Sequence, residues 1–480
     1  MQSPLRVLFL LQRPEAWGNV ASLWCRMRVD SRFEPVAWLL PYNVENASLS
    51  AVRAVDHRAL LSAEQVSYVE WDPSLLLQPG QFDVAIFTHP YDRERPQPLW
   101  FQRVRRCVEH IVYIPYGLTV GAGAKNLRLQ FAQPLQIGAD LIVARSMGEK
   151  AMYARHCPRG DAHVRVVGHP RFDRMVQALS ASVDDALQSR IGNRTAILWN
   201  SHFSFGHRYS QSSNFSTFDL LGPELFEYFI ARRETLCLIW RPHPGLFPAL
   251  LEQALLTAEQ LPILRAELQA LGIVVDESPG HLPAFACSRA MLSDPGSFLF
   301  DYLALQRPQL VLVNPEGEPL NEEASTLVQA LGGAASIAPV EAFIDAVLDG
   351  RIDTEVLAEH RKQFLPWADG HSAERILALI ADGEAAVTPA PLVTAPLGGA
   401  HAGMREQDGP AVPLPTAAVP PVLAALLDGL RRIRAEKAAE AATRKRLRRV
   451  MNRARTWLGE RIKQHPGLMA AVSRVRAGRK

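Results

Sequence analysis

Short apolar runs of strand length recur along the chain, and their alternation with helix-like segments restricts the fold more than any other feature. Six runs lie at residues 5–11, 33–40, 82–88, 110–115, 139–144 and 163–168, and five more at 195–200, 236–240, 272–276, 290–294 and 309–313. Strands separated by helices at this spacing indicate βαβ units, and unbroken apolar runs are typical of parallel strands buried on both faces. The sequence therefore predicts an α/β protein built on two series of parallel strands.

The chain is long enough for two domains with separate cores. Its 480 residues, of which 48% are hydrophobic, exceed what one core usually holds. We expect two Rossmann-like domains that face a cleft, an N-terminal one at residues 1–175 and a C-terminal one at 176–382. Residues 383–420, rich in Ala, Pro and Gly, are predicted to form a flexible linker, and residues 421–480 a basic amphipathic helical tail.

Cysteine use and hydropathy predict a cytoplasmic protein. The five cysteines are scattered, without Cys-x-x-Cys spacing, which argues against both disulfide frameworks and zinc sites. No apolar stretch reaches the roughly 18 residues that a membrane-spanning helix needs. We therefore expect a chain in a reducing compartment that is soluble or bound to a membrane surface.

The first candidate site follows the run at 236–240, in the sequence Trp-Arg-Pro-His-Pro at 240–244. Ligands of open parallel sheets bind beyond the carboxyl ends of the strands. Arg241 offers a planar fork of N–H donors suited to phosphate oxygens, and His243 can donate a hydrogen bond beside it. The alternative interpretation is a proline-shaped turn in which His243 satisfies a loop carbonyl.

The second candidate site follows the run at 290–294, where Ser-Asp-Pro-Gly-Ser at 293–297 leads into a helix. Backbone N–H groups at a helix N-terminus attract anions, and the small Gly296 and Ser297 let a diphosphate approach the backbone. Asp294, next to Ser293, is a candidate to accept a hydrogen bond from a ribose hydroxyl or to cap the helix. Ordinary helix capping is the alternative interpretation.

Together these loops resemble the CDP-glycerol glycerophosphotransferase family, the teichoic-acid-polymerase-like enzymes of GT-B fold. The resemblance rests on Arg-Pro-His-Pro at 241–244, Ser-Asp-x-x-Ser-x-x-x-Asp-Tyr at 293–302, Arg-Pro at 307–308 and Asp-Gly-x-Ser-x-x-Arg at 369–375. It is carried by the order and spacing of the motifs, covers residues 110–382 and is strongest in the second domain.

The resemblance implies a role for each matching position of the second domain. Arg241 and His243 stand where the family meets the donor diphosphate, and the loop at 293–297 stands where it holds the phosphates. Asp301 matches an acidic residue that is structural or directed at the ribose. Independently of the resemblance, His202 follows the run at 195–200, where a GT-B donor site would also be lined, and is a candidate contact for donor or acceptor, with structural packing as its alternative.

Two further segments match the family near the domain boundary. The segment at 369–375 is expected to precede a last helix that crosses back toward the first domain, with Ser372 as its cap. Gly-His-Pro-Arg-Phe-Asp at 168–173 resembles the segment that ends the first domain of the family. We interpret it as a hinge and an interdomain contact.

The first domain departs from the family at its expected base. Where the family carries a His-Gly-Thr loop, with the histidine as proposed general base, this chain has Tyr116. A tyrosine, with an ordinary pKa of about 10, is a poor base at neutral pH. His89, at the end of the run at 82–88, is the substitute that would point into the same cleft.

No metal or cofactor is expected. A DxD motif is absent between the strands, and no His, Asp or Glu cluster has metal-ligand spacing. This pattern favours metal-independent catalysis in which Arg, His and backbone N–H groups neutralise the diphosphate of a nucleotide-activated donor. The nucleotide would then be a substrate.

The tail carries the excess of positive over negative charge in this chain. Residues 421–480 contain 17 Lys and Arg against 4 Asp and Glu, which leaves 35 against 45 in the rest of the chain. An acidic main body argues against nucleic-acid binding by the catalytic part. A basic helix interleaved with apolar residues is suited to an anionic membrane surface. The alternatives for the tail are a helix that mediates homo-oligomerisation, a nucleic-acid arm and a solvated segment.

These observations predict a transferase at the inner face of the cytoplasmic membrane. It would move glycerol- or ribitol-phosphate from a CDP-activated donor to a cell-surface polymer or lipid-linked acceptor. His243, His89 and Tyr116 are the candidate catalytic residues. The first alternative is a GT-B glycosyltransferase that uses a UDP-, GDP- or CMP-sugar in surface polysaccharide synthesis. The second is a non-catalytic membrane-associated assembly protein, suggested by the tyrosine at 116.

Overall fold

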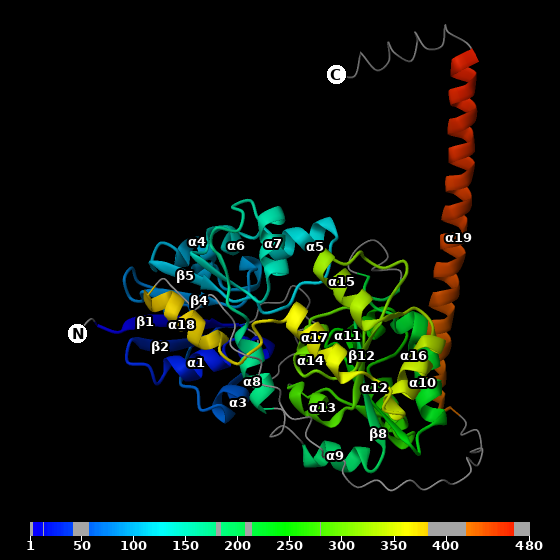
Figure 1. Cartoon of the computed structure of the whole chain (residues 1–480), viewed down its shortest axis with the longest axis horizontal. Coiled ribbons are helices and arrows are strands. Elements are labelled where there is room, and N and C mark those ends of the chain that lie inside the picture. The colour runs from blue at the N-terminus through cyan, green and yellow to red at the C-terminus, as the bar shows by residue number, and fades with distance from the viewer. Residues whose placement is uncertain are drawn as a thin grey trace.

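In the computed structural model, the chain forms two α/β domains side by side, and a long helix projects from the second of them (Figure 1). The structure describes residues 3–12, 14–41, 57–178, 184–206, 214–278, 280–382 and 419–464. Nearly all of the predicted linker and the end of the tail after 464 lie outside the described residues. None of the helices within these ranges is long and apolar enough to span a bilayer.

In the part of the first domain that the structure describes, seven strands form one sheet with helices on both faces. Its strands are β1 (Leu5–Leu11), β2 (Phe33–Leu39), β3 (Tyr68–Glu70), β4 (Val84–Phe87), β5 (His110–Tyr113), β6 (Leu141–Ala144) and β7 (Val164–Val166). Its helices are η1 (Pro14–Asn19), α1 (Ala21–Met27), α3 (His57–Ala63), η2 (Asp92–Glu94), η3 (Gln97–Leu99), α4 (Phe101–Val104), α5 (Ala124–Phe131), α6 (Pro134–Gly138), α7 (Met147–His156) and α8 (Pro170–Ala178).

The second domain holds six strands. They are β8 (Thr195–Ser201), β9 (Leu236–Pro242), β10 (Val274–Val275), β11 (Ala290–Ser293), β12 (Gln309–Leu312) and β13 (Gly333–Ala334). The helices that follow the first domain are α9 (Asp185–Ile191), α10 (Phe218–Ala231), α11 (Leu246–Glu252), α12 (Gln260–Ala270), α13 (Leu282–Cys287), α14 (Phe298–Ala304), α15 (Glu322–Leu331), α16 (Ile337–Leu348), α17 (Thr354–Phe364), α18 (Ser372–Asp382) and α19 (Pro421–Gln464).

All eleven predicted runs form strands, and the two parallel sheets share one strand order. The first sheet runs β3-β2-β1-β4-β5-β6-β7 and the second β10-β9-β8-β11-β12-β13. In each sheet the winding reverses beside the first strand of the domain, where β1 pairs with β4 and β8 pairs with β11. Such a switch point leaves a binding position beyond the carboxyl ends of the strands. The topology therefore marks one such position in each domain.

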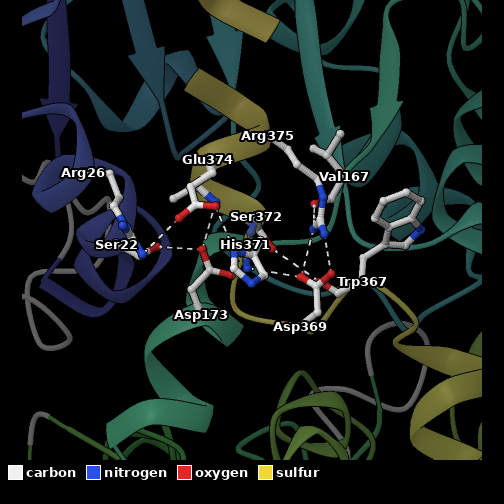
Figure 2. Close-up of polar contacts among 11 residues, drawn as sticks. Ser22, Arg26, Val167, Asp173, Trp367, Asp369, His371, Ser372, Glu374 and Arg375 are labelled. Carbon is white, nitrogen blue, oxygen red and sulfur yellow. Dashed lines mark hydrogen bonds and ion pairs between the residues drawn. The ribbon is translucent and has the colours of Figure 1, made fainter. Parts of the chain in front are cut away.

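The last helix before the linker, α18, packs on the first domain, although it follows the second in sequence. Ile376 and Leu377 belong to the core that surrounds β1 and α1, and Figure 2 shows how the start of the helix is held. The Asp173 carboxylate accepts the backbone N–H of Ser372 at 3.0 Å and that of Ala373 at 2.8 Å. The crossing predicted for this segment is confirmed. Asp173 of the first domain, and not Ser372, supplies the cap.

Polar contacts hold the two domains together on the opposite side of the boundary. The Asn321 backbone N–H donates to the Val120 carbonyl at 2.8 Å, and its side chain donates to the Thr119 carbonyl at 3.1 Å. Arg145, which follows β6, is buried and forms an ion pair with Glu323 of α15. The segments that follow the strands of the first sheet therefore face the second domain.

The first part of α19 belongs to the second domain. Leu423, Leu426 and Leu430 are fully buried against α10 and α12. Lys437 forms a buried ion pair at 2.8 Å with Asp219 of α10. The tail expected from the sequence as one unit is thus divided into a docked part, to residue 437, and an arm at 438–464 that projects from the body (Figure 1).

Candidate functional site

Two histidines meet beyond the carboxyl ends of neighbouring strands in the second domain. His202 directly follows β8 and His243 directly follows β9, and these strands pair in parallel up to the register of Ser201 with Pro242. The centres of the two imidazole rings lie 5.2 Å apart. Phe203 contacts both rings, at 4.5 and 4.6 Å between ring centres. The strand register thus brings together two residues that the sequence singled out separately.

Backbone donors set the tautomer of both rings. The Gly245 N–H donates to Nδ1 of His243 at 3.0 Å, and the Ser204 N–H donates to Nδ1 of His202 at 3.2 Å. Burial lowers the pKa of His202 to about 4, so this ring is neutral at physiological pH. A neutral imidazole that accepts at Nδ1 carries its proton on Nε2. His202 therefore presents an Nε2–H donor, the polarity that a phosphate oxygen requires, and the Gly245 N–H at Nδ1 favours the same tautomer in His243.

Asp294 is a buried structural residue at the end of β11. Its carboxylate accepts the backbone N–H of His202 at 2.7 Å, the N–H of Thr217 at 3.1 Å and the Thr217 hydroxyl at 2.5 Å. Burial raises the pKa of Asp294 to about 7, and these hydrogen bonds oppose the rise. Asp294 therefore fixes the loop that carries His202, and it is only 2% exposed.

The rest of the predicted phosphate loop divides into a buried and an open part. The Ser293 hydroxyl is buried and donates to the Asp294 carbonyl at 2.8 Å. Gly296 and Ser297 are partly exposed and lead into α14. A Cβ atom added at Gly296 would meet only the Asp294 carbonyl oxygen, at 3.8 Å, so its surroundings are open. Gly296 and Ser297 are thus the part of this loop that a ligand can reach.

Arg241 is tied to groups that the sequence did not single out. It donates to the Asp276 carboxylate at 2.6 Å, to the Ser278 hydroxyl at 3.1 Å and to the Ser278 carbonyl at 2.8 Å. Asp276 directly follows β10, so its place at the carboxyl end of a predicted strand was the available signal. The guanidinium is thus held in a fixed orientation beside the end of β9.

Asp301 lies in the domain boundary. It is fully buried on α14 and pairs at 2.5 Å with Arg171, which follows β7 in the first domain. Burial raises the pKa of Asp301 to about 6, and the positive charges of Arg171 and Arg145 oppose the rise. The pair also confirms that the segment at 168–173 makes an interdomain contact, and it gives Asp301 a structural partner in place of a ribose.

The first domain forms a second cluster around its own switch point. His89 follows β4, Tyr116 follows β5, and their ring centres lie 4.9 Å apart. Tyr91 contacts the His89 ring at 4.8 Å. The Glu94 carboxylate lies 3.3 Å from Nε2 of His89. The structure therefore joins the two candidate bases and adds Tyr91 and Glu94, which their spacing in the sequence did not reveal.

The loop that carries Tyr116 is anchored on both sides and continues to the second domain. His169 donates through Nε2 to the Pro115 carbonyl at 2.8 Å. Burial lowers the pKa of this histidine to about 3, so the ring is neutral. The Asn19 amide donates to the Tyr116 carbonyl at 3.1 Å. Five residues later, Gly121 forms a β-bridge with Leu320.

The two clusters face the same domain boundary. Gly121 lies close to Phe215, since a Cβ atom added at this glycine would be 2.8 Å from the Phe215 ring. The Phe215 ring in turn lies 5.8 Å from that of His202. Across the residues that the structure describes, no group of three or more His, Cys, Asp or Glu side chains is arranged to hold a metal ion.

Comparison with known proteins shows the fold. Neither a protein-family model nor a curated protein sequence matches the chain. Among solved structures it is similar to a variant of the wall teichoic acid polymerase TagF with CDPG, with a TM-score of 0.52 and 11% identity over 80% of this chain and 90% of that one. The GT-B fold that the motifs implied is thus matched by a teichoic acid polymerase structure.

Two further solved structures are similar to the same extent. A putative UDP-N-acetylglucosamine 2-epimerase from Listeria monocytogenes has a TM-score of 0.51 and 14% identity, over 79% of this chain and 96% of that one. The S. aureus MnaA–UDP co-structure has a TM-score of 0.50 and 16% identity, over 78% and 96%. At these identities the likeness establishes two Rossmann-like domains in the GT-B arrangement.

Proposed function

We propose that the chain is a nucleotide-dependent transferase that moves glycerol- or ribitol-phosphate from a CDP-activated donor to a surface-polymer or lipid-linked acceptor. The observation that carries the proposal is the pair of histidines at the ends of β8 and β9, His202 and His243, each of which accepts a backbone N–H at Nδ1. Donors fixed before the reaction stabilise charge that develops on a phosphate without reorganising. The pair lies beside the switch point, where nucleotides bind in sheets of this order.

The comparisons support a nucleotide ligand for this position. The similar MnaA structure is a complex with UDP, and the similar TagF structure was soaked with CDPG. Both proteins share the two-domain arrangement of this chain. A cytidine or uridine diphosphate group therefore suits the second domain, and the motif resemblance favours the CDP-linked polyol.

Each residue of the proposed donor site has its own role in the transfer reaction. His202 and His243 donate to the diphosphate, the loop at Gly296 and Ser297 supplies backbone N–H groups, and Arg241 adds positive charge from its fixed position. The acceptor hydroxyl attacks the β-phosphorus, and CMP leaves. The reaction is metal-independent, since these donors neutralise the diphosphate, and EDTA is expected to leave the rate unchanged.

The projecting arm suits an anionic membrane surface and a lipid-linked acceptor at the inner face of the cytoplasmic membrane. Residues 438–464 contain 9 Lys and Arg against 2 Asp and Glu. Arg444, Lys445, Arg446 and Arg449 are all exposed. Each basic residue contributes about 1 kcal/mol near anionic headgroups. Replacing Arg444 and Lys445 by glutamine is therefore expected to weaken sedimentation with anionic vesicles by roughly 30-fold, whereas neutral vesicles bind neither protein.

Identification of the released nucleotide tests the proposal. Purified protein is incubated with a lipid-linked acceptor extract and with CDP-glycerol, CDP-ribitol, UDP-sugars or GDP-sugars in turn. CMP formed only from a CDP-polyol, and lost in His243→Ala, supports the phosphotransferase. A nucleoside diphosphate from a sugar donor would assign a glycosyltransferase instead, and no release from any donor would favour the non-catalytic assembly protein.

A matched control separates loss of the site from general damage. His110 is an exposed histidine at the amino end of β5 in the first domain, whereas the proposed donor site lies at the second sheet. His110→Ala is expected to release the nucleotide at the wild-type rate. Equal loss in His110→Ala and His243→Ala would show that the effect does not come from the donor site.

A further inference from the structure

The cluster at the first switch point contains a shielded carboxylate for which the proposed transfer reaction gives no role. We propose that Glu94 and His89 form a proton-accepting pair behind Tyr116, and that Tyr116 is the group that meets the acceptor hydroxyl. Tyr116 and His89 are then catalytic residues, and Glu94 is a positioning residue that acts through His89. This inference rests on the proposed transfer to a hydroxyl acceptor and deepens it.

The group that would meet the substrate is more exposed than the group that would accept its proton. Tyr116 is partly exposed, the Glu94 side chain is 14% exposed and the His89 side chain only 2%. A substrate in the domain boundary can therefore reach the tyrosine but not the imidazole. His89, the proton-accepting group, is therefore buried behind Tyr116, the group that meets the substrate.

The carboxylate sets the orientation of the imidazole. Glu94 Oε2 lies 3.3 Å from Nε2 of His89, so the proton of the neutral ring is favoured on Nε2 and Nδ1 is left as the proton acceptor. The imidazolium formed on protonation would face a negative charge at the same distance. A carboxylate in this position raises the basicity of a histidine and stabilises its charged form.

Both chain segments are fixed independently of this contact. Arg95 donates to the His89 carbonyl, and Gln12 donates to the Glu94 carbonyl. The loop of Tyr116 is held by His169 and Asn19, as described above. The geometry of the cluster therefore does not depend on the Glu94 side chain, and a substitution there can be isosteric.

Other charged and titratable groups surround the pair. Arg93 lies 4.0 Å from Glu94, and the buried Arg95 pairs with Asp92 at 3.5 Å. Burial raises the pKa of Tyr91, and its interactions with Tyr116 and Tyr113 raise it further, so Tyr91 keeps its proton. Tyr91 thus takes no part as a base and serves as a neutral hydrogen-bond partner of Tyr116.

The relay overcomes the weakness of a lone tyrosine. The acceptor O–H proton passes to the Tyr116 oxygen while the Tyr116 proton passes to Nδ1 of His89. The acceptor oxygen forms its bond to the β-phosphorus, and the phosphoanhydride bond to CMP breaks. His89 leaves the step as an imidazolium balanced by Glu94, and it returns its proton to solvent after product release. The imidazole of His89 thereby accepts the proton in the deprotonation that tyrosine alone performs poorly.

The pH dependence of turnover tests the relay in the full-length protein. Glu94→Gln keeps the shape of the side chain and is expected to lower kcat by about 10-fold, to leave the donor KM unchanged and to move the acidic limb of the rate profile to lower pH. Glu94→Asp is expected to restore part of the rate. Glu109→Gln, a change at an 81% exposed side chain of the same domain, is the control with a wild-type profile.

A readout that needs no turnover separates the relay from the proposed function. Nuclear magnetic resonance titration of the histidines is expected to show His89 titrating at lower pH in Glu94→Gln than in the wild type, because the nearby negative charge is lost. An unchanged His89 titration would overturn the pairing even if the enzyme is active. Conversely, a shifted titration in a protein that turns over no donor would refute the transferase and leave the pairing intact.

The role of the tyrosine has its own test. Tyr116→Phe removes the hydroxyl and is expected to lower kcat by about 100-fold, as His89→Gln does, since both interrupt the same transfer. A Tyr116→Phe variant with the wild-type rate would overturn the relay, because the acceptor would then reach another base directly.

Discussion

Replacement of Glu323 by alanine is expected to lower the free energy of unfolding, because this residue forms a buried ion pair between the two domains. Its carboxylate pairs with Arg145, whose side chain is fully buried, and accepts the Ser146 hydroxyl at 2.5 Å. Removing one partner of a buried ion pair costs about 3–5 kcal/mol, because the other charge stays desolvated. Arg145 would keep Glu149 at 3.3 Å and the Phe300 ring at 4.0 Å, so we expect the lower end, about 3 kcal/mol.

The adjacent residue provides the control. Glu322 forms an ion pair across the same boundary with Arg155 at 2.6 Å, but these side chains are 70% and 54% exposed. An exposed pair contributes less than about 1 kcal/mol. The free energy of unfolding is measured by urea titration with tryptophan fluorescence for the wild type, Glu323→Ala and Glu322→Ala. Equal losses in the two variants would show that burial of the Arg145–Glu323 pair adds nothing to its contribution.

Two further predictions concern the second domain. Lys437→Ala leaves Asp219 buried without its ion-pair partner and is expected to lower the free energy of unfolding by about 3 kcal/mol. The control Lys445→Ala, on the exposed arm, is expected to change it by less than about 0.5 kcal/mol. Equal effects of the two substitutions would contradict the docking of α19. Folding raises the pKa of Asp294 from 3.8 to about 7. Between these pH values the folded protein keeps the Asp294 proton, whereas the unfolded chain has released it. Its contribution is therefore fully present below pH 3.8 and is lost as pH rises toward 7, by about 4 kcal/mol in total, and unfolding of Asp294→Asn should lack this decline.

Most of the fold could be predicted because buried parallel strands are continuous apolar runs. All eleven predicted runs are strands, and β1 has the predicted bounds. The two strands that were missed, Tyr68–Glu70 and Gly333–Ala334, lie at sheet edges and contain three and two residues. Both lack a continuous apolar run, unlike the equally short edge strands β7 and β10, which lie within the runs at 163–168 and 272–276.

The candidate site could be predicted in position but only partly in its contacts. His89, Tyr116, His202 and His243 each follow a predicted strand, and parallel sheets place such residues at one edge. Which of them meet depends on strand order, which a single sequence does not specify. Glu94 reaches His89 from a short 3-10 turn, a local geometry that leaves no periodic pattern.

Charge composition alone did not predict that the tail is divided into a docked part and a projecting arm. The sequence marks residues 421–480 as basic, and this property belongs mostly to the projecting arm. The docked part is defined instead by leucines at 423, 426 and 430, spaced three and four residues apart, which match α10 and α12. Its partner charge, Asp219, lies about two hundred residues away in the chain, so spacing alone could not identify the pair.

The affinity of the protein for nucleotides shows whether His202 and His243 hold a nucleoside diphosphate at the ends of β8 and β9. Calorimetric titration with CDP and UDP is performed on the wild type, His202→Ala, His243→Ala and His110→Ala. A hydrogen bond to a charged group contributes about 1.5–3 kcal/mol, so each site variant is expected to bind about 10- to 100-fold more weakly, and His110→Ala like the wild type. Wild-type affinity in His243→Ala, or no binding of either nucleotide by the wild type, would contradict the account.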